Sequence, residues 1–394
     1  MDNAVVVTGF GMVSSLGSDV SQALARMDTG SFTCETHKVR GHQIPAAMVR
    51  EFNATDYIAE KKIRRMDSVN CYAIAAATRA LNDAGIVAAD KDNCGVIVGT
   101  GFSGFASVVK HLGAYLQDGM RMLTPFHFPN TVYNASAGMV AIELGLNGPN
   151  TTVVGYDVSG EYALTYAWML LRQGMAERVL VVGADDLCPA LLEGMYDMGL
   201  PRSVAMSDLP PFSSRADGLL PSEGAGALLL ELADSAAKRG ARVLGRISSI
   251  GIWSSADSQF GYGSAARAIV TASTQALEAA DIEMGDVAWV SSAANGHRDL
   301  DAAEAKVWSE RLSGKQRLVS FKRFFGDYAA SGITRIGLAL HCALRGQVPG
   351  FTVDDALPGI APWLPHGPES LSGHRVLHQG VGVGGNAISI LLAV

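Results

Sequence analysis

A nine-residue pattern occurs twice in this chain and narrows the folds that it can adopt. TRALNDAGI at 78–86 resembles TQALEAADI at 274–282. Each copy precedes an acidic turn, an apolar segment of strand length and a small-residue loop, GTGFSG at 99–104 and SSAANG at 291–296. Alanine-rich helices can resemble one another by chance, but two similarly built halves explain the whole succession better.

Strand and helix signals alternate along the chain. Helical spacing of apolar residues predicts helices at 64–85 and 160–174. Apolar runs predict buried strands at 4–8, 94–99, 151–156, 178–183 and 225–231. This alternation indicates an α/β layered fold. We expect an N-terminal half at 1–245, with insertions at an interface, and a C-terminal half at 246–394, packed as one body.

Composition excludes several classes of protein. Hydrophobic residues make up 48% and charged residues 18%, which argues against disorder. The net charge of −7 argues against a nucleic-acid partner. There is no run of 18 apolar residues, so no membrane span is expected. The first residues lack a basic region, and the five cysteines lack metal-binding spacing, so we expect a cytoplasmic protein without a metal.

Three glycine-containing segments are candidate functional turns. GTGFSG fits the dinucleotide pattern GxGxxG, but a strand and a helix precede it, which favours a plain tight turn. GVGVGG at 380–385, with Gly382, Val383 and Gly384, is predicted to line a pocket. VVGYDVSGE at 153–161 predicts a strand, a sharp turn and a helix start, with Asp157 at the apex. Asp157 and Ser159 could be nucleophile candidates or ordinary helix caps.

Together these segments resemble the β-ketoacyl synthase family of the thiolase fold. The resemblance covers nearly the whole chain and implies a thiolase-like five-layer αβαβα fold of two duplicated halves. The segments that carry it are VVVTGFGMVSSLG (5–17), RRMDSVNCYAIAAATRALNDAG (64–85), GLNGPNTTVVGYDVSG (145–160), PFSSRADGLLPSEGAGALLLE (211–231), LDAAEA (300–305), VSFKRFFG (319–326) and GVGVGGN (380–386).

Active members of that family need a cysteine nucleophile and two histidines. The motif positions of these groups correspond here to Asp157, Ala293 and Asp327. A carboxylate is a poorer acyl acceptor than a thiolate, alanine donates no hydrogen bond, and an ionised Asp327 would repel an enolate. No independent catalysis is therefore expected. Residues that the family retains around these positions are Glu223, Asp301, Glu304 and Lys322.

Loss of all three groups makes the chain most similar to the chain-length factor of type II polyketide synthases, although such subunits most often carry glutamine where this chain has Asp157. The resemblance implies no cofactor, an active ketosynthase partner in a heterodimer, and an acyl carrier protein that delivers the growing polyketide. It also implies a tunnel at the interface that limits product length, and places segment 130–143 at that interface. Phe105, Val108 and Leu112 share one face of the helix after GTGFSG and are candidate tunnel residues; a plain core stripe is the alternative.

Two other functions remain open. One is an acyl hydrolase that uses Asp157 or Ser159, with His297 as the histidine of the replaced loop. The other is a pseudoenzyme that binds an acyl ligand outside polyketide synthesis. The sequence also leaves the product class open between aromatic polyketides and aryl polyenes.

Overall fold

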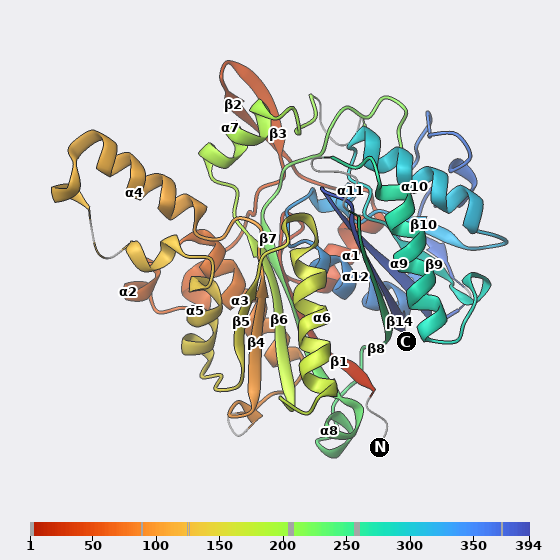
Figure 1. Cartoon of the computed structure of the whole chain (residues 1–394), viewed down its shortest axis with the longest axis horizontal. Coiled ribbons are helices and arrows are strands. Elements are labelled where there is room, and N and C mark those ends of the chain that lie inside the picture. Colours follow the sequence, from red (N-terminus) through yellow and green to blue (C-terminus); the bar gives the residue numbers. More distant parts are fainter. Residues whose placement is uncertain are drawn as a thin grey trace.

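The computed structural model describes residues 4–87, 90–123, 125, 127–203, 209–255, 261–371 and 373–394 (Figure 1). The strands are β1 Val5–Val13, β2 Glu35–Val39, β3 His42–Ala46, β4 Cys94–Gly99, β5 Asn150–Val153, β6 Arg178–Asp185, β7 Gly224–Leu232, β8 Gly245–Ser254, β9 Trp289–Ser291, β10 Arg317–Val319, β11 Gln347–Val348, β12 Glu369–Ser370, β13 Arg375–Gly382 and β14 Asn386–Ala393. The α-helices are α1 Val20–Asp28, α2 Glu60–Ile63, α3 Ser68–Asp83, α4 Phe105–Asp118, α5 Ala135–Leu144, α6 Ser159–Arg172, α7 Pro189–Asp197, α8 Ala233–Lys238, α9 Ala265–Ala279, α10 Arg298–Arg311, α11 Lys322–Phe325 and α12 Gly332–Arg345.

The main sheet repeats one strand pattern. Its order is β10-β9-β13-β14-β8-β1-β7-β6-β4-β5. In the first half β4 runs parallel to β5 and β6, and β7 is antiparallel to both β6 and β1. In the second half β9 runs parallel to β10 and β13, and β14 is antiparallel to both β13 and β8. The two halves follow the same chain order, which confirms the duplication.

The two sets of five strands meet through a short contact, since β1 pairs with β8 at Val5–Val7 alone. Helices α6 and α12 pack against each other between the two sets. Helices α3 and α5 cover the outer face of the first set, and α9 and α10 the outer face of the second (Figure 1). This gives the predicted five layers, αβαβα. The boundary near residue 245 remains a prediction.

Small residues allow the two repeated helices, α3 and α9, to pack closely against the strands β1 and β8. A Cβ on Gly9 of β1 would lie 2.2 Å from Ala80 O of α3, and a Cβ on Gly251 of β8 would lie 2.0 Å from Ala272 O of α9. Side chains at these glycines would force the helices off the sheet. The alanine-rich repeat therefore reflects close helix-to-strand packing in both halves.

Several predicted boundaries are wrong. The strand predicted to end at residue 8 continues to Val13. The helix predicted from residue 64 begins at Ser68, because Asp67 has an extended backbone that ends a turn after α2. The strand predicted to residue 156 ends at Val153, because Gly155 and Tyr156 turn the chain and Tyr156 has a φ of 46°. Residues that look like strand in sequence therefore form the turn into α6.

Helix α4 projects from the body of the molecule (Figure 1). All of its residues are described, and Ser107 is the buried one. Its apolar side chains are therefore surface in the isolated chain, which is contrary to the alternative of a plain core stripe. In the described residues no helix is long and apolar enough to span a membrane.

Candidate functional site

The site lies where the carboxyl ends of the parallel strands of both halves meet. The turn before α6 follows β5, and the corresponding turn before α12 follows β10. The loops after β4 and β9 reach the same region, because Asp185 at the end of β6 bonds to the first loop and Asn295 of the second loop bonds to Asp327. Ligands of open α/β sheets bind at such strand ends. We call the positions of Asp157, Ala293 and Asp327, where the family resemblance predicts replaced catalytic groups, the degenerate site.

Asp157 is held by two donors that come from elsewhere in the chain. Its Oδ2 accepts hydrogen bonds from Tyr262 Oη and from the Val383 backbone N, each at 3.2 Å. Burial raises the pKa of the Asp157 carboxyl and the nearby Asp327 adds to the rise, while Lys322 and the two donors oppose it. The Asp157 carboxyl is therefore bonded by the chain's own donors, unlike a free carboxylate nucleophile.

Ser159 organises the turn. Its Oγ accepts the Gly155 backbone N–H at 2.9 Å and lies 2.7 Å from Tyr156 O and 3.0 Å from Thr100 O, to which it can donate. The structure gives α6 no side-chain cap, so neither Asp157 nor Ser159 has the predicted capping role. The Ser159 hydroxyl is bonded to backbone groups and is fully buried, which is contrary to its use as a nucleophile.

Ala293 lies in a loop that two buried carboxylates support. Its backbone N donates to Glu304 Oε1 at 3.0 Å, and the Ser292 hydroxyl donates to Glu304 Oε2. Asp301 accepts the backbone N–H groups of Asn295 and Gly296 at 3.0 and 3.1 Å. Burial raises the pKa of Glu304 to about 7 and that of Asp301 to about 6, although hydrogen bonds oppose both shifts. These two predicted residues shape the loop.

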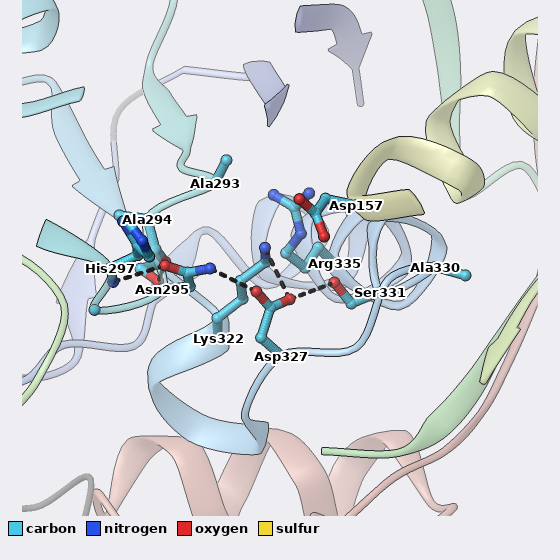
Figure 2. A network of polar contacts seen from close by, with 12 residues as sticks. Asp157, Ala293, Ala294, Asn295, His297, Lys322, Asp327, Ala330, Ser331 and Arg335 are labelled. Carbon is cyan, nitrogen blue, oxygen red and sulfur yellow. Dashed lines mark hydrogen bonds and ion pairs between the residues drawn. The ribbon is translucent and has the colours of Figure 1, made fainter. Parts of the chain in front are cut away.

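Asp327 is the centre of a polar network (Figure 2). Its Oδ1 lies 2.8 Å from Lys322 Nζ and 3.4 Å from Ser331 Oγ, and its Oδ2 accepts Asn295 Nδ2 at 2.7 Å. Lys322 and Asp327 are 2% and 8% exposed. With three donors on a buried carboxylate, this position is arranged to hold a negative charge. It cannot perform the hydrogen-bond donation of a histidine.

The predicted pocket turn lies against the turn before α6. Gly382 ends β13, and a Cβ there would lie 3.3 Å from a Val158 methyl. Gly384 has a φ of 90°, which requires glycine at low energy. The Val383 N–H bonds to Asp157, so this backbone donor is occupied by the chain itself.

The contacts of the other predicted residues are with other parts of the chain. Glu223 accepts backbone N–H groups of Val49 and Leu187 and the Tyr72 hydroxyl, so it joins segments beside β7. Phe105, Val108 and Leu112 lie on the exposed helix α4 with 36%, 38% and 52% exposure. The loop GTGFSG has the amides of Gly101 and Phe102 bonded to Asp185, which leaves them unavailable for a nucleotide phosphate.

Sequence reasoning missed a buried charged group beneath the site. Arg335 donates to Glu161 Oε1 at 2.5 Å and to the Ser292 and Gln379 carbonyls. His378 Nε2 lies 3.1 Å from the same Glu161 oxygen. Arg335 and His378 hold the pKa of Glu161 below its usual value although burial alone would raise it. The sequence did contain a signal for this pair. Glu161 lies among the apolar residues of α6, and Arg335 lies among those of α12.

Tyr262 was also missed, because its loop carried no recognisable motif. Its ring lies 5.0 Å from that of His297, centroid to centroid. Burial lowers the pKa of His297, while Asp299 and Asp157 oppose the shift. Tyr262, rather than the predicted base His297, is the side chain bonded to Asp157. Across the described ranges, no group of three His, Cys, Asp or Glu side chains is arranged to hold a metal ion.

Known proteins resemble the chain in sequence. The family profile described as "Beta-ketoacyl synthase, N-terminal domain" matches residues 2–236. The chain is 28% identical over 411 residues to the 3-oxoacyl-[acyl-carrier-protein] synthase 2 of Vibrio harveyi, covering 98% of this chain and 97% of that protein. The profile match extends over more than half of the chain.

Solved structures agree in fold. "The ishigamide ketosynthase/chain length factor" superposes with a TM-score of 0.91 at 23% identity, covering 99% of each chain. A complex of the ketosynthase ApeO with its chain length factor ApeC, from Xenorhabdus doucetiae, gives a TM-score of 0.82 at 19% identity, covering 99% of this chain and 98% of that one. These similarities show the thiolase-like architecture of the ketosynthases.

Proposed function

The chain belongs to the β-ketoacyl synthase family, and on this premise we propose that it is a non-catalytic subunit of the chain-length-factor type. It pairs with an active ketosynthase and shapes the tunnel that receives a carrier-protein-bound polyketide. The observation that carries the proposal is the degenerate site itself. Asp157 stands in place of the thiol, and the Lys322–Asp327–Asn295 network stands in place of a histidine.

The polar network around Asp327 indicates that the site has adapted to the replacement of the histidine. Asp327 accepts from Lys322, Asn295 and Ser331, so its replacement of histidine is accommodated by neighbouring donors. An enolate needs donors or positive charge at the position where its own charge develops. Here the donors are already bonded to a carboxylate of the chain. Decarboxylation at this site is therefore disfavoured, and the partner must supply the chemistry.

The proposed heterodimer has a suitable surface. In the main sheet of the described residues, β5 is an edge strand with β4 as its neighbour, so its other edge presents backbone donors and acceptors. Exposed apolar residues of α4 lie between 36% and 72% exposure: Phe105, Val108, Val109, Leu112, Tyr115 and Leu116. An apolar surface of this kind is typical of protein interfaces. A partner that covers α4 would turn its exposed stripe into a tunnel wall.

A carrier protein of acidic charge has a candidate docking groove. Lys61, Lys62 and Arg65 line a surface cavity of about 380 Å³ together with Met66, Met139 and Ile142. Lys62 is paired with Glu143 at 2.7 Å, so part of the local charge is balanced. Basic groups around an apolar patch favour an acidic partner with an apolar contact.

The acyl-hydrolase alternative receives less support. Ser159 is buried among backbone partners, and Asp157 is bonded by Tyr262 and Val383. Hydrolysis through an acyl-enzyme requires an exposed nucleophile next to a base. The other alternative, an acyl-binding pseudoenzyme outside polyketide synthesis, also expects an inactive site. It differs from our proposal because it expects no ketosynthase partner.

Co-expression with an active ketosynthase from the same genome tests the proposal. We expect a one-to-one complex in size-exclusion chromatography and intact mass spectrometry, with malonyl-dependent elongation that needs the partner's cysteine. Asp157→Asn should leave elongation intact. The proposal would be overturned if the chain formed a homodimer that does not bind the ketosynthase. It would also be overturned if Asp157→Asn abolished elongation while the complex still formed.

A pair of surface variants locates the interface. Leu116 on α4 is 72% exposed and Val87 beyond α3 is 61% exposed. Leu116→Glu should abolish co-purification with the ketosynthase, because a carboxylate would be buried in the interface. Val87→Glu makes the same chemical change away from α4 and should leave the complex intact. If Leu116→Glu co-purifies with the ketosynthase as well as Val87→Glu does, α4 is excluded from the interface.

A further inference from the structure

Four hydrogen-bond donors converge on the carboxylate of Asp185, the last residue of β6. Its Oδ1 accepts Thr100 Oγ1, Gly101 N and Phe102 N, each at 2.8 Å. Its Oδ2 accepts Ala330 N, also at 2.8 Å. The side chain is 2% exposed. One carboxylate therefore joins the loop that leads into α4 to the loop that leads into α12.

These loops belong to different halves of the fold and lie in direct contact. A Cβ on Gly101 would lie 2.4 Å from the Ala329 Cβ, so the first loop has no room to move towards the second. Ala330 follows Asp327 by three residues and thus belongs to the loop of the degenerate site. Asp185 therefore bonds both to the loop that leads into α4 and to the loop that carries Asp327.

The loop that Asp185 holds forms the base of α4. Phe105 begins the helix three residues after Phe102, and Gly104 between them has a φ of 81°. Besides the buried Ser107, α4 contacts α7 and the turns at Met120–Met122 and Phe128–Thr131, which all lie outside the main sheet. A helix of 14 residues is about 21 Å long, so a small rotation at its base displaces its far end by several ångströms.

A neutral side chain could not replace this carboxylate. An asparagine of the same shape has one acceptor oxygen and one NH₂ donor. Placed here, it would direct the NH₂ group at Ala330 N–H or at the donors of residues 100–102. One of the two loops would lose its acceptor and face a donor instead, which is costly in a buried position.

We propose that Asp185 is a positioning residue that sets the angle of α4 relative to the degenerate site and thereby determines the length at which the product tunnel closes. The inference rests on the proposed function, since product length has meaning only in a complex with a ketosynthase. Asp185 acts through Phe105, Val108 and Leu112 and touches no substrate.

The test compares Asp185→Asn with Asp186→Asn in the complex with the ketosynthase. Asp186 is the next residue, is 7% exposed and accepts the Val69 backbone N–H, so it provides the same substitution at a neighbouring buried site. Products are measured by mass spectrometry at matched turnover. We expect a several-fold rise in off-length products for Asp185→Asn and the wild-type distribution for Asp186→Asn.

A second pair of variants decides the matter if Asp185→Asn does not fold. Thr100→Val removes one donor to Asp185 and the acceptor of the Ser103 N–H, whereas Thr100→Ser keeps the hydroxyl for both bonds. The valine variant should shift the product distribution and the serine variant should not. A wild-type distribution in folded Asp185→Asn or Thr100→Val would overturn the inference. Failure of the wild-type complex to form or elongate would instead overturn the proposed function.

Discussion

The Lys322 Nζ lies 2.8 Å from Asp327 Oδ1, and both side chains are nearly inaccessible to solvent. Removing one partner of a buried ion pair leaves an uncompensated charge and costs about 3–5 kcal/mol. We therefore expect Asp327→Ala to lower the free energy of unfolding by about this amount, measured by denaturant titration. The exposed pair Glu60–Arg64, with side chains 76% and 80% exposed, provides the control. Glu60→Ala should cost less than about 1 kcal/mol, and an equally small cost for Asp327→Ala would contradict the prediction.

The buried pair of Glu161 and Arg335 should show strong coupling. Glu161→Gln leaves the Arg335 guanidinium without its counter-charge, so unfolding should become easier by about 3–5 kcal/mol. The double variant Glu161→Gln with Arg335→Met removes both charges and should recover much of that loss. A double-mutant cycle measures the coupling. Additive losses in the two single variants would show that the ion pair contributes nothing specific.

Acid should destabilise the protein through His378. Burial, together with the nearby Arg335, lowers the pKa of His378 to about 4 from 6.5, even though Glu161 opposes the shift. The unfolded chain binds a proton between pH 6.5 and 4 that the folded chain does not, so stability falls on acidification across this window, by on the order of 3 kcal/mol. The difference in unfolding free energy between wild type and His378→Gln isolates this contribution. That difference should shift in favour of the variant from pH 7 to pH 4.5, and no shift would refute the assignment.

The effect of Glu304 on stability should be opposite to that of His378, because Glu304 stabilises the protein at acidic pH. Burial raises its pKa to about 7 from 4.5, despite the hydrogen bonds from Ser292 and Ala293. The folded chain then keeps a proton that the unfolded chain releases, so this stabilisation is complete below about pH 4.5 and is lost as the pH rises through 7. Glu304→Gln removes the titration. The destabilisation caused by the variant should therefore be larger at pH 5 than at pH 8, and a pH-independent difference would contradict this.

The basic groove predicts a charge effect on carrier-protein binding. Lys61 is exposed in the groove, whereas Lys238 is exposed at the end of α8. Lys61→Glu should weaken carrier-protein binding to the complex about fivefold, which corresponds to roughly 1 kcal/mol. Lys238→Glu is the matched control and should have no effect. Binding is measured by titration at two salt concentrations, and the effect of Lys61→Glu should shrink at the higher one.

The alternation of strands and helices and the internal repeat predicted an α/β fold of two similar halves, because both are local patterns, whereas the five layers were implied by the family resemblance. The repeated segments at 78–86 and 274–282 fall on α3 and α9, which occupy equivalent places in the two halves. The turn before α6 was also predicted, since a strand that runs into glycine and then a helix has few alternatives. The exact backbone course of this turn was not predicted, because the φ of 46° at Tyr156 depends on the contacts that Ser159 makes.

The partners of the degenerate site could not be predicted in the same way. Tyr262 and Val383 lie 105 and 226 residues from Asp157, and His378 lies 217 residues from Glu161. No periodicity in sequence links such positions, because they meet only after both halves have folded and packed.

The sequence by itself determined the duplicated α/β architecture, since this follows from residue identity and local spacing, and it placed Asp157, Ala293 and Asp327 at the positions where the family resemblance predicts a cysteine and two histidines. The tertiary structure decided what the replacements do: Asp157 accepts Val383 N–H, Asp327 pairs with Lys322, and Asp185 joins two loops. The physical reason is that burial and hydrogen bonding set the energy of a polar group, and both depend on neighbours that the fold brings from distant parts of the chain.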